Sequence, residues 1–303
     1  MIGWVYKGFA ETYQRLGVDF DQLYYVSETY VSGRQIVLDD LEKGAESLFF
    51  KREDGSTWID LTDATLDEKV VLRKDGTSMY ITQDIGTATL RYGDFQMDKM
   101  VYVVGNEQDY HFKVLFEILG RLGHPYAKDC HHLSYGMVNL TSGKMKSREG
   151  TVVDADDLMT EVIQSVQQES ESRQKLGGLS DADKAAIYAQ VGLGALKFYI
   201  LKVEPKKSMV FDPKQSIDLQ GQTGPYVQNA YVRTQSVQRM VQEKGIEITT
   251  YADYGLSEVE RDILVLVHDF PTIVQRAADH YNPAEVVNYL YDLAKTFHQL
   301  WSH

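Results

Sequence analysis

The chain has 303 residues, of which 43% are hydrophobic and 25% are charged, and its formal net charge is −13. This composition is typical of a folded protein with real hydrophobic cores, and the length predicts two domains. The negative charge excludes recognition of nucleic acid through the overall field, so such a partner has to bind local basic patches. The single cysteine, Cys130, excludes an internal disulfide and a cysteine-rich metal site.

The chain contains no apolar run that approaches the length of a transmembrane helix. Its first residues lack the basic and then apolar pattern of a signal peptide. A lone cysteine fits a reducing compartment. We therefore expect a cytoplasmic protein without a membrane partner.

The first quarter of the chain predicts a helix, one β-α unit and two hairpins. Residues 1–17 have apolar side chains at helical spacing, residues 23–26 predict a strand, and residues 31–44 predict a helix. Asp54-Gly55 and Asp75-Gly76 are strong turn pairs. They join the apolar runs 47–50 and 57–61, and 70–73 and 79–82. Hairpins at this place indicate an insertion into a parallel-sheet domain.

Tyr80 and Asp84 are four residues apart, where a strand is expected to give way to a helix. If the helix begins near Thr82, the ring and the carboxylate both face the carboxyl edge of the sheet, where open α/β folds bind ligands. In the alternative, Tyr80 is a core aromatic and Asp84 is a charge placed for the helix dipole. Spacing alone favours this alternative.

Residues 100–104 form an uninterrupted apolar run that ends at Gly105, which predicts a strand in the sheet interior. A helix then follows, with Gln108 and His111 on one face at its positive N-terminal end. The glycine allows a ligand to approach the backbone. The alternative, in which Gln108 caps the helix and His111 is a surface imidazole, is equally compatible with the spacing.

A basic loop follows the next predicted strand, residues 135–140. Lys144, Lys146 and Arg148 lie between two glycines, a pattern that can surround a phosphate and neutralise its charge. Taken alone, the loop is better explained as a solvated surface hairpin. His131 and His132 point to opposite faces of a strand and have no further ligand at suitable spacing, so we interpret them as structural and predict no metal site.

From here the pattern is helical. Residues 154–157 resemble a capping box, residues 175–179 are the best linker candidate, and residues 180–183 form a second helix start. The helix through residues 187–201 is apolar enough to be central. Pro225 marks another helix start, and residues 258–280 and 283–301 predict two more helices. We expect an α/β domain over residues 1–176 and an all-α domain over residues 177–303.

Together these motifs resemble the C-terminal part of the arginyl-tRNA synthetases, which are class I aminoacyl-tRNA synthetases. The resemblance covers almost the whole chain and is carried by Gln108, His111 and residues 75–77, 80–85, 102–105, 136–138, 143–150 and 223–226. It implies part of a Rossmann-like parallel sheet with inserted hairpins. A helical-bundle anticodon-binding domain, C-terminally truncated, follows.

The family's functional residues match positions of this chain. The resemblance implies that Tyr80, Asp84 and Gln108 bind the substrate arginine, whose planar guanidinium suits a carboxylate acceptor. Lys144, Lys146 and Arg148 are implied as catalytic, in a loop similar to the KMSKS loop that stabilises the ATP phosphates. Tyr226 and Arg233 are implied to contact tRNA. The residues implied to bind ATP are Gly105, His111, Gly136, Met137, Val138 and Ser147.

The implied activity is ligation of arginine to tRNA(Arg), with ATP and with Mg²⁺ that binds with the nucleotide. Two departures qualify it. Ser147 stands where the class pattern has its second lysine, which leaves open which cation reaches the phosphates, and the chain contains no His-x-Gly-His. We therefore expect a fragment that lacks the first half of the catalytic fold and is inactive alone.

The sequence is compatible with two alternatives. One is a non-catalytic tRNA-binding module derived from a synthetase. The other is a helical interaction domain on an unrelated nucleotide-binding fold, which would not bind arginine. We expect the parent protein to be monomeric, and the fragment to self-associate through an unpaired strand edge of its sheet.

Overall fold

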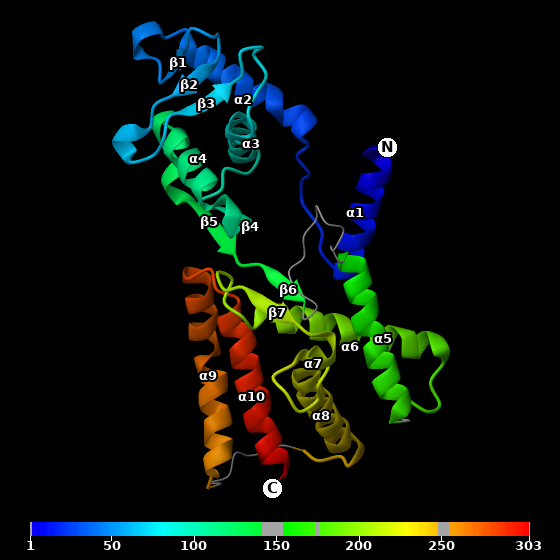
Figure 1. The fold of residues 1–303 in the computed structure, drawn as a ribbon. Helices are drawn as coiled ribbons and strands as arrows, with labels where there is room; N and C mark the ends of the chain where they lie inside the picture. Colours follow the sequence, from blue (N-terminus) through cyan, green and yellow to red (C-terminus); the bar gives the residue numbers. More distant parts are fainter. Residues whose placement is uncertain (1, 141–153, 174–175, 248–254, 303) are drawn as a thin grey trace. The chain divides into compact units, whose positions relative to one another are not determined.

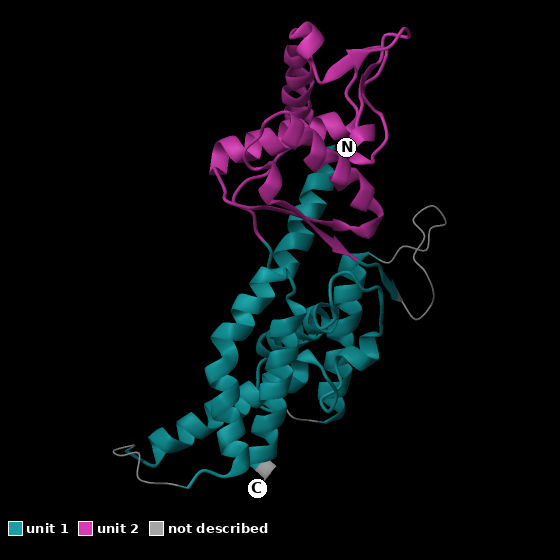
Figure 2. Cartoon of the chain, turned by 90° about the vertical axis from the view of Figure 1, so that its left-hand side faces the viewer, with its two compact units in different colours: residues 1–18, 136–303 teal, residues 19–135 magenta. Residues whose placement is uncertain are grey.

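The computed structural model describes residues 2–140, 154–173, 176–247 and 255–302. The chain divides into two compact units, which are described separately. One consists of residues 19–135, and the other of residues 1–18 and 136–303 (Figure 2). The expected fold class is confirmed, because parallel strands and inserted antiparallel hairpins precede a run of helices.

The unit of residues 19–135 begins with an irregular segment and helix α2 (Val26–Leu41). The strand predicted for residues 23–26 is wrong, since residues 22–25 have no regular structure and Val26 already belongs to the helix. Tyr24 instead donates a hydrogen bond from its hydroxyl to Asp94 Oδ2 at 2.6 Å. A strand needs a neighbour to pair with, and the β propensity of a short aromatic run does not supply one.

An antiparallel sheet follows, made of β1 (Phe49–Lys51), β2 (Thr57–Ile59) and β3 (Lys69–Leu72). The first predicted hairpin is confirmed, with Phe50 opposite Trp58 and Gly55 at φ +86° in the turn. The second is only partly right. Leu72 and Ser78 form a single bridge across the Asp75-Gly76 turn, and the chain then enters helix α3 (Tyr80–Phe95).

Helices α2 and α3 cross with their backbones in contact. A Cβ atom on Gly33 would lie 1.8 Å from the carbonyl oxygen of Thr82, and one on Gly86 would lie 2.3 Å from the Gly33 nitrogen. Thr82 is buried and donates from its hydroxyl to Val71 O at 2.6 Å, which ties the start of α3 to β3. Only glycine fits at either position of this crossing.

A parallel β-α-β unit completes this part of the chain. Strands β4 (Met100–Gly105) and β5 (Cys130–Tyr135) pair in register from Met100 opposite Cys130. Between them lie the short helix η3 (Asn106–Gln108) and helix α4 (Asp109–Arg121). The buried core of the unit includes Val37, Ile59, Ile85, Phe112, Leu115 and Leu119.

The sequence predicted β4 as an interior strand, and this is wrong for the residues that the structure describes. Within them β4 pairs with β5 alone. Met100 is buried, whereas Val103 on the opposite face is 63% exposed. A strand covered on one face only should alternate between apolar and polar residues, which this run does not do.

The other unit is mainly helical (Figure 1). It contains α1 (Ile2–Leu16), the parallel strands β6 (Val138–Leu140) and β7 (Met209–Phe211), and helices α5 (Ala155–Ser172), α6 (Asp181–Leu201), α7 (Pro213–Ser216), α8 (Gly224–Glu243), α9 (Glu258–Asp279) and α10 (Ala284–Ser302). The strand predicted for residues 135–140 is divided between β5 and β6. As predicted, α6 is central, and it packs against α5, α7, α8 and α10.

The helix starts follow local capping rules. Ser180 accepts a hydrogen bond from Asp183 N at 3.2 Å, and Ser257 forms a full capping box with Glu260. Asp154 stands at the start of α5 as predicted, but its side chain makes no capping bond. Among the helices of the described ranges, none combines the length and the hydropathy needed to cross a membrane.

The α2–α3 crossing gives a test of the fold. We expect Gly33→Ala to lower the free energy of unfolding by about 3 kcal/mol or more, because the new methyl group meets backbone atoms. Gly93→Ala is the matched control, since Gly93 lies on α3 with open space around it. It should raise stability by about 0.5–1 kcal/mol. Urea unfolding followed by circular dichroism measures both, and equal effects would contradict the crossing.

Candidate functional site

The starts of α3 and α4 bring two predicted site residues together. His111 Nε2 lies 2.6 Å from Asp84 Oδ2, and both side chains are partly exposed. A carboxylate oxygen accepts hydrogen bonds, so the imidazole donates from Nε2. Asp84 therefore does more than place a charge near the helix dipole, because it accepts this hydrogen bond. His111 is not a free surface imidazole, because it donates the bond.

Tyr80 stands at the first position of α3, and its side chain is 77% exposed. The alternative in which it is a core aromatic is therefore wrong. Its exposure follows from the helix start, because the adjacent Ile81 and Thr82 take the buried positions. The ring is available to a ligand at the same helix end that carries Asp84.

A cavity of about 350 Å³ opens beside these residues. Tyr110 lines this cavity and is fixed by two contacts. Its hydroxyl donates a hydrogen bond to Asp67 Oδ2 at 2.6 Å, and Lys69 Nζ lies 4.5 Å from the centre of its ring. The hydrogen bond from Tyr110 lowers the pKa of Asp67. The lining consists of Lys69, Val70, Met79, Tyr80, Ile81, Glu107, Tyr110, His111 and Val114. Carboxylates beside aromatic rings suit a planar cation.

Gln108 and Gly105 border the same helix start. Gln108 is the residue before α4, is exposed, and makes no capping hydrogen bond, so the capping alternative is not realised. A Cβ atom on Gly105 would lie 3.7 Å from the ring of Tyr135, an ordinary contact distance. Packing within the described protein therefore does not require a glycine at the end of β4.

Gly136, Met137 and Val138 belong to the other unit, where the protein itself uses their backbone. Gly136 N donates to Pro205 O at 2.7 Å, and a Cβ atom there would lie 2.5 Å from Lys207 C. Met137 N donates to Ser208 Oγ at 3.3 Å. Val138 pairs with Met209 in the β6–β7 ladder. The glycine is thus required by its own neighbours, independently of any ligand.

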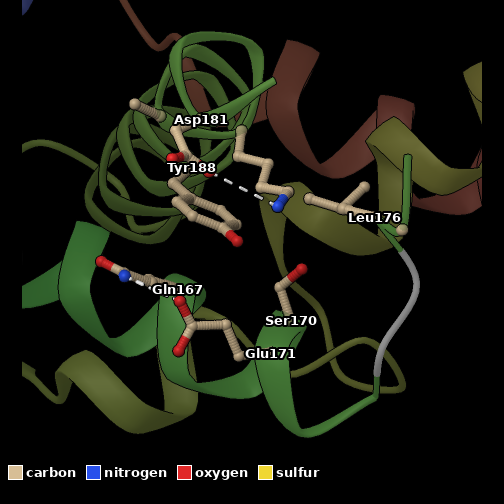
Figure 3. Close-up of a pocket in the computed structure, with 9 residues that line it drawn as sticks. Gln167, Ser170, Glu171, Leu176, Asp181 and Tyr188 are labelled. Carbon is tan, nitrogen blue, oxygen red and sulfur yellow. Dashed lines mark hydrogen bonds and ion pairs between the residues drawn. The ribbon is translucent and has the colours of Figure 1, made fainter. Parts of the chain in front are cut away.

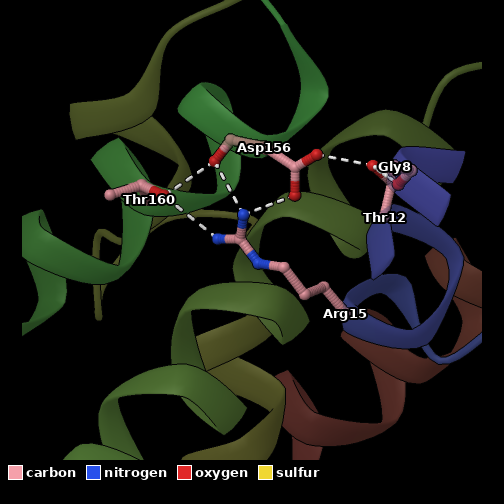
Figure 4. Close-up of polar contacts among 5 residues, drawn as sticks. All are labelled: Gly8, Thr12, Arg15, Asp156 and Thr160. Atoms are coloured by element: carbon pink, nitrogen blue, oxygen red, sulfur yellow. Dashed lines mark hydrogen bonds and ion pairs between the residues drawn. The ribbon is translucent and has the colours of Figure 1, made fainter. Parts of the chain in front are cut away.

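The basic loop residues Lys144, Lys146, Ser147 and Arg148 lie outside the described residues. The start of α5, which follows the loop, is described and is bound to α1 (Figure 4). Asp156 accepts a hydrogen bond from Thr12 Oγ1 at 2.5 Å and one from the guanidinium of Arg15. Arg15 also donates to Thr160 Oγ1 at 3.0 Å. Thr12 and Arg15 lower the pKa of Asp156, the hydrogen bond from Thr12 more strongly.

The predicted tRNA residues Tyr226 and Arg233 both lie on α8 and meet His298 of α10. The rings of Tyr226 and His298 are 4.7 Å apart and edge to face. Arg233 Nη1 lies 2.9 Å from His298 Nδ1, and its Cζ atom lies 5.6 Å from the centre of the Trp301 ring. A guanidinium only donates, so Nδ1 accepts and the imidazole is neutral. Burial lowers the pKa of His298, and Arg233 adds to the effect.

Several of these partners were not identified from the sequence. Thr12, Arg15 and Tyr110 are ordinary helix residues there, and His298 and Trp301 stand at the end of an aromatic helix. The only available signals were an acid in the first turn of α5 and a lone histidine among aromatics.

His132, which the sequence analysis interprets as structural, donates a hydrogen bond from Nε2 to Val104 O at 3.0 Å.

Comparison with known proteins finds two family matches in the chain. Residues 7–212 match tRNA synthetases class I (R), catalytic domain, and residues 227–303 match the DALR anticodon binding domain. The chain is similar to the arginine–tRNA ligase of Bacteroides thetaiotaomicron, with 52% identity over 99% of the chain and 50% of that protein. That of Flavobacterium psychrophilum is also 52% identical, over 98% of the chain and 49% of that protein. The chain thus spans about half the length of the curated relatives it matches.

Solved structures agree on the fold. Thermus thermophilus arginyl-tRNA synthetase superposes with a TM-score of 0.81 at 24% identity, covering 95% of the chain and 53% of that protein. Arginyl-tRNA synthetase from Plasmodium falciparum superposes with a TM-score of 0.79 at 18% identity, covering 98% of the chain and 50% of that protein.

The lowered pKa of His298 makes stability depend on pH. The folded state binds fewer protons there than the unfolded state, so stability is present above the ordinary pKa of 6.5 and is lost as the pH falls towards the lowered value. We expect the free energy of unfolding to fall between about pH 7.5 and about pH 5. The fall should be smaller in His298→Gln, which cannot titrate. Parallel urea titrations measure the difference, and identical pH profiles would contradict it.

Proposed function

The chain belongs to the class I arginyl-tRNA synthetase family, and from this premise we propose that it serves the ATP-dependent ligation of arginine to tRNA(Arg) in the cytoplasm. In this reaction the arginine carboxylate attacks the α-phosphate of ATP and pyrophosphate leaves. The 3′-terminal ribose of the tRNA then takes the arginyl group and AMP leaves. The observation that carries the proposal is the Asp84–His111 hydrogen bond beside the exposed ring of Tyr80.

Tyr80, Asp84 and Gln108 are the proposed arginine-binding residues. The bond from His111 engages Oδ2 of Asp84, which leaves the other carboxylate oxygen to accept from a guanidinium. The exposed Tyr80 ring offers its face to the same planar cation. Gln108 is exposed and makes no capping bond, so its amide is available to the ligand.

ATP is the proposed second substrate and brings Mg²⁺ with its phosphates. We assign its adenosine side to Gly105, His111, Gly136, Met137 and Val138. Gly105 supports this assignment, because packing within the described protein does not require a glycine there. The N–H groups of Gly136 and Met137 already bind protein atoms, so contacts at these two residues would use their other atoms.

The proposed phosphate-binding residues are Lys144, Lys146, Ser147 and Arg148. Three cations in so short a loop can neutralise the charge that grows on the phosphates, and catalysis is then mainly positioning and charge stabilisation. The hydrogen bonds from Thr12 and Arg15 of α1 to Asp156 support the assignment, because they fix the start of α5, the helix that follows the loop.

We propose that Tyr226 and Arg233 on α8 contact the tRNA. The packing of both against His298 gives them defined positions, and a guanidinium suits a phosphate. We keep the boundary between a catalytic part, residues 1–176, and an anticodon-binding part, residues 177–303, as a proposal.

Arginine binding tests the proposal. We expect Asp84→Asn to weaken binding of arginine to the purified chain by about 10-fold or more, since it removes a charged hydrogen bond. Asp98→Asn is the matched control, an exposed carboxylate just beyond the end of the same helix. Calorimetry with arginine measures both variants. Equal affinities would refute the role of Asp84, whereas tRNA binding without any arginine binding would favour a non-catalytic tRNA-binding module.

The chain alone should not activate arginine. It contains no His-x-Gly-His and spans about half the length of its relatives. We expect the purified chain to give no tRNA-dependent exchange of pyrophosphate into ATP. Exchange above the level of a Lys144→Ala, Lys146→Ala double variant would overturn this expectation.

We also propose that the isolated chain self-associates through β4, whereas the parent protein is monomeric. In the described residues this strand pairs on one side only, and Val103 is exposed. An unpaired strand edge is a template for another chain. Sedimentation should show dimers or larger species that Val103→Lys reduces, and a wild-type chain that remains monomeric would contradict the proposal.

A further inference from the structure

A second cavity lies among helices α5 and α6, entirely within the unit of residues 1–18 and 136–303. Its volume is about 410 Å³, within the usual range for small-molecule sites of about 300–1,000 Å³. It shares no residue with the cavity beside Tyr80. The lining residues are Gln167, Ser170, Glu171, Leu176, Gly177, Asp181, Lys184, Ala185 and Tyr188 (Figure 3).

The feature that points to a ligand is Tyr188. The residue is only 7% exposed and its hydroxyl has no hydrogen-bond partner among the residues that the structure describes, but the hydroxyl is not a fully buried atom, so it is open to the cavity. A hydroxyl at the surface of a cavity can both donate to and accept from a bound molecule. Figure 3 shows this hydroxyl facing into the cavity, together with that of Ser170, which likewise lacks a partner in the described ranges.

A cation lines the same cavity. Lys184 stands one helical turn before Tyr188 on α6, so the two side chains share a helix face. The ammonium group is 3.6 Å from Asp181, a fully exposed carboxylate, while the Lys184 side chain itself is 32% exposed. Such a solvated pair contributes little, so the ammonium remains available to a ligand anion.

A carboxylate lines the other wall. Glu171 accepts a hydrogen bond from Gln167 Nε2 at 2.8 Å through Oε1. Its other oxygen has no partner within the described part of the chain. Glu171 and Asp181 together disfavour a ligand with several negative charges, such as a free phosphate, whereas Lys184 disfavours a simple cation. The charges are complementary to a molecule that carries one group of each sign.

We propose that this cavity binds a small zwitterion of the α-amino-acid type. Its carboxylate accepts hydrogen bonds from Lys184, Tyr188 and Ser170, and its ammonium group binds Glu171. Leu176, Ala185 and the ring of Tyr188 provide apolar contact for its side chain. The site is independent of the proposed arginine site, because it uses none of the residues assigned there.

The test uses leucine, which also separates this site from an arginine-binding one. NMR titration of the ¹⁵N-labelled chain is done with leucine, with leucinamide, which has no carboxylate, and with 4-methylpentanoate, which has no ammonium group. We expect leucine to bind about tenfold or more tightly than either analogue, because each lacks one charged hydrogen-bonding group. The shifted amides should lie on α5 and α6.

Variants of the chain assign the groups. Tyr188→Phe should weaken leucine binding by about three- to tenfold, since it removes only a hydroxyl, whereas Tyr231→Phe, at a site 65% exposed on α8, should have no effect. Lys184→Met should abolish the preference for leucine over leucinamide. The proposal is overturned if leucine does not bind, if inorganic phosphate binds more tightly, or if Tyr188→Phe binds like the wild-type chain.

Discussion

The contact on which the unit of residues 19–135 depends is made of backbone alone. Gly33 of α2 lies against the carbonyl of Thr82, and Gly86 of α3 lies against Gly33. With no side chain between the helices, the first turn of α3 is fixed to within the tolerance of atomic packing. Tyr80 begins this turn and Asp84 follows it directly, so the crossing also fixes the positions of these two residues. The bond between Asp84 and His111 then joins α3 to α4.

Local features of the fold were predictable because their causes are local. The turn at Asp54-Gly55 and the helix starts at Ser180 and Ser257 depend on residues within a few positions of one another. The strand expected at residues 23–26 and the interior position expected for β4 depended on neighbours that a sequence does not display. The α2–α3 crossing is likewise invisible in sequence, where Gly33 and Gly86 look like any helical glycines.

In the candidate site, too, the sequence predicts what is determined locally and misses what depends on distant residues. Periodicity located Tyr80, Asp84, Gln108 and His111 near helix starts, and the family resemblance supplied their roles. That Asp84 and His111 would bind each other across 27 positions followed from neither. Arg233 and His298 are separated by 65 positions. Side-chain partners so distant in sequence are decided by packing, which is why the sequence yielded candidates and the structure yielded their pairs.

The bond between Thr12 and Asp156 also constrains how the chain reaches its native state. It closes a loop of 144 positions, and that loop contains the whole unit of residues 19–135. Closing so long a loop is entropically costly unless the intervening chain is already compact. During synthesis α1 emerges before α5 and cannot form this contact until α5 follows, while the unit between them can complete its own core. Helix α1 is therefore expected to dock after the unit that follows it in the sequence has folded.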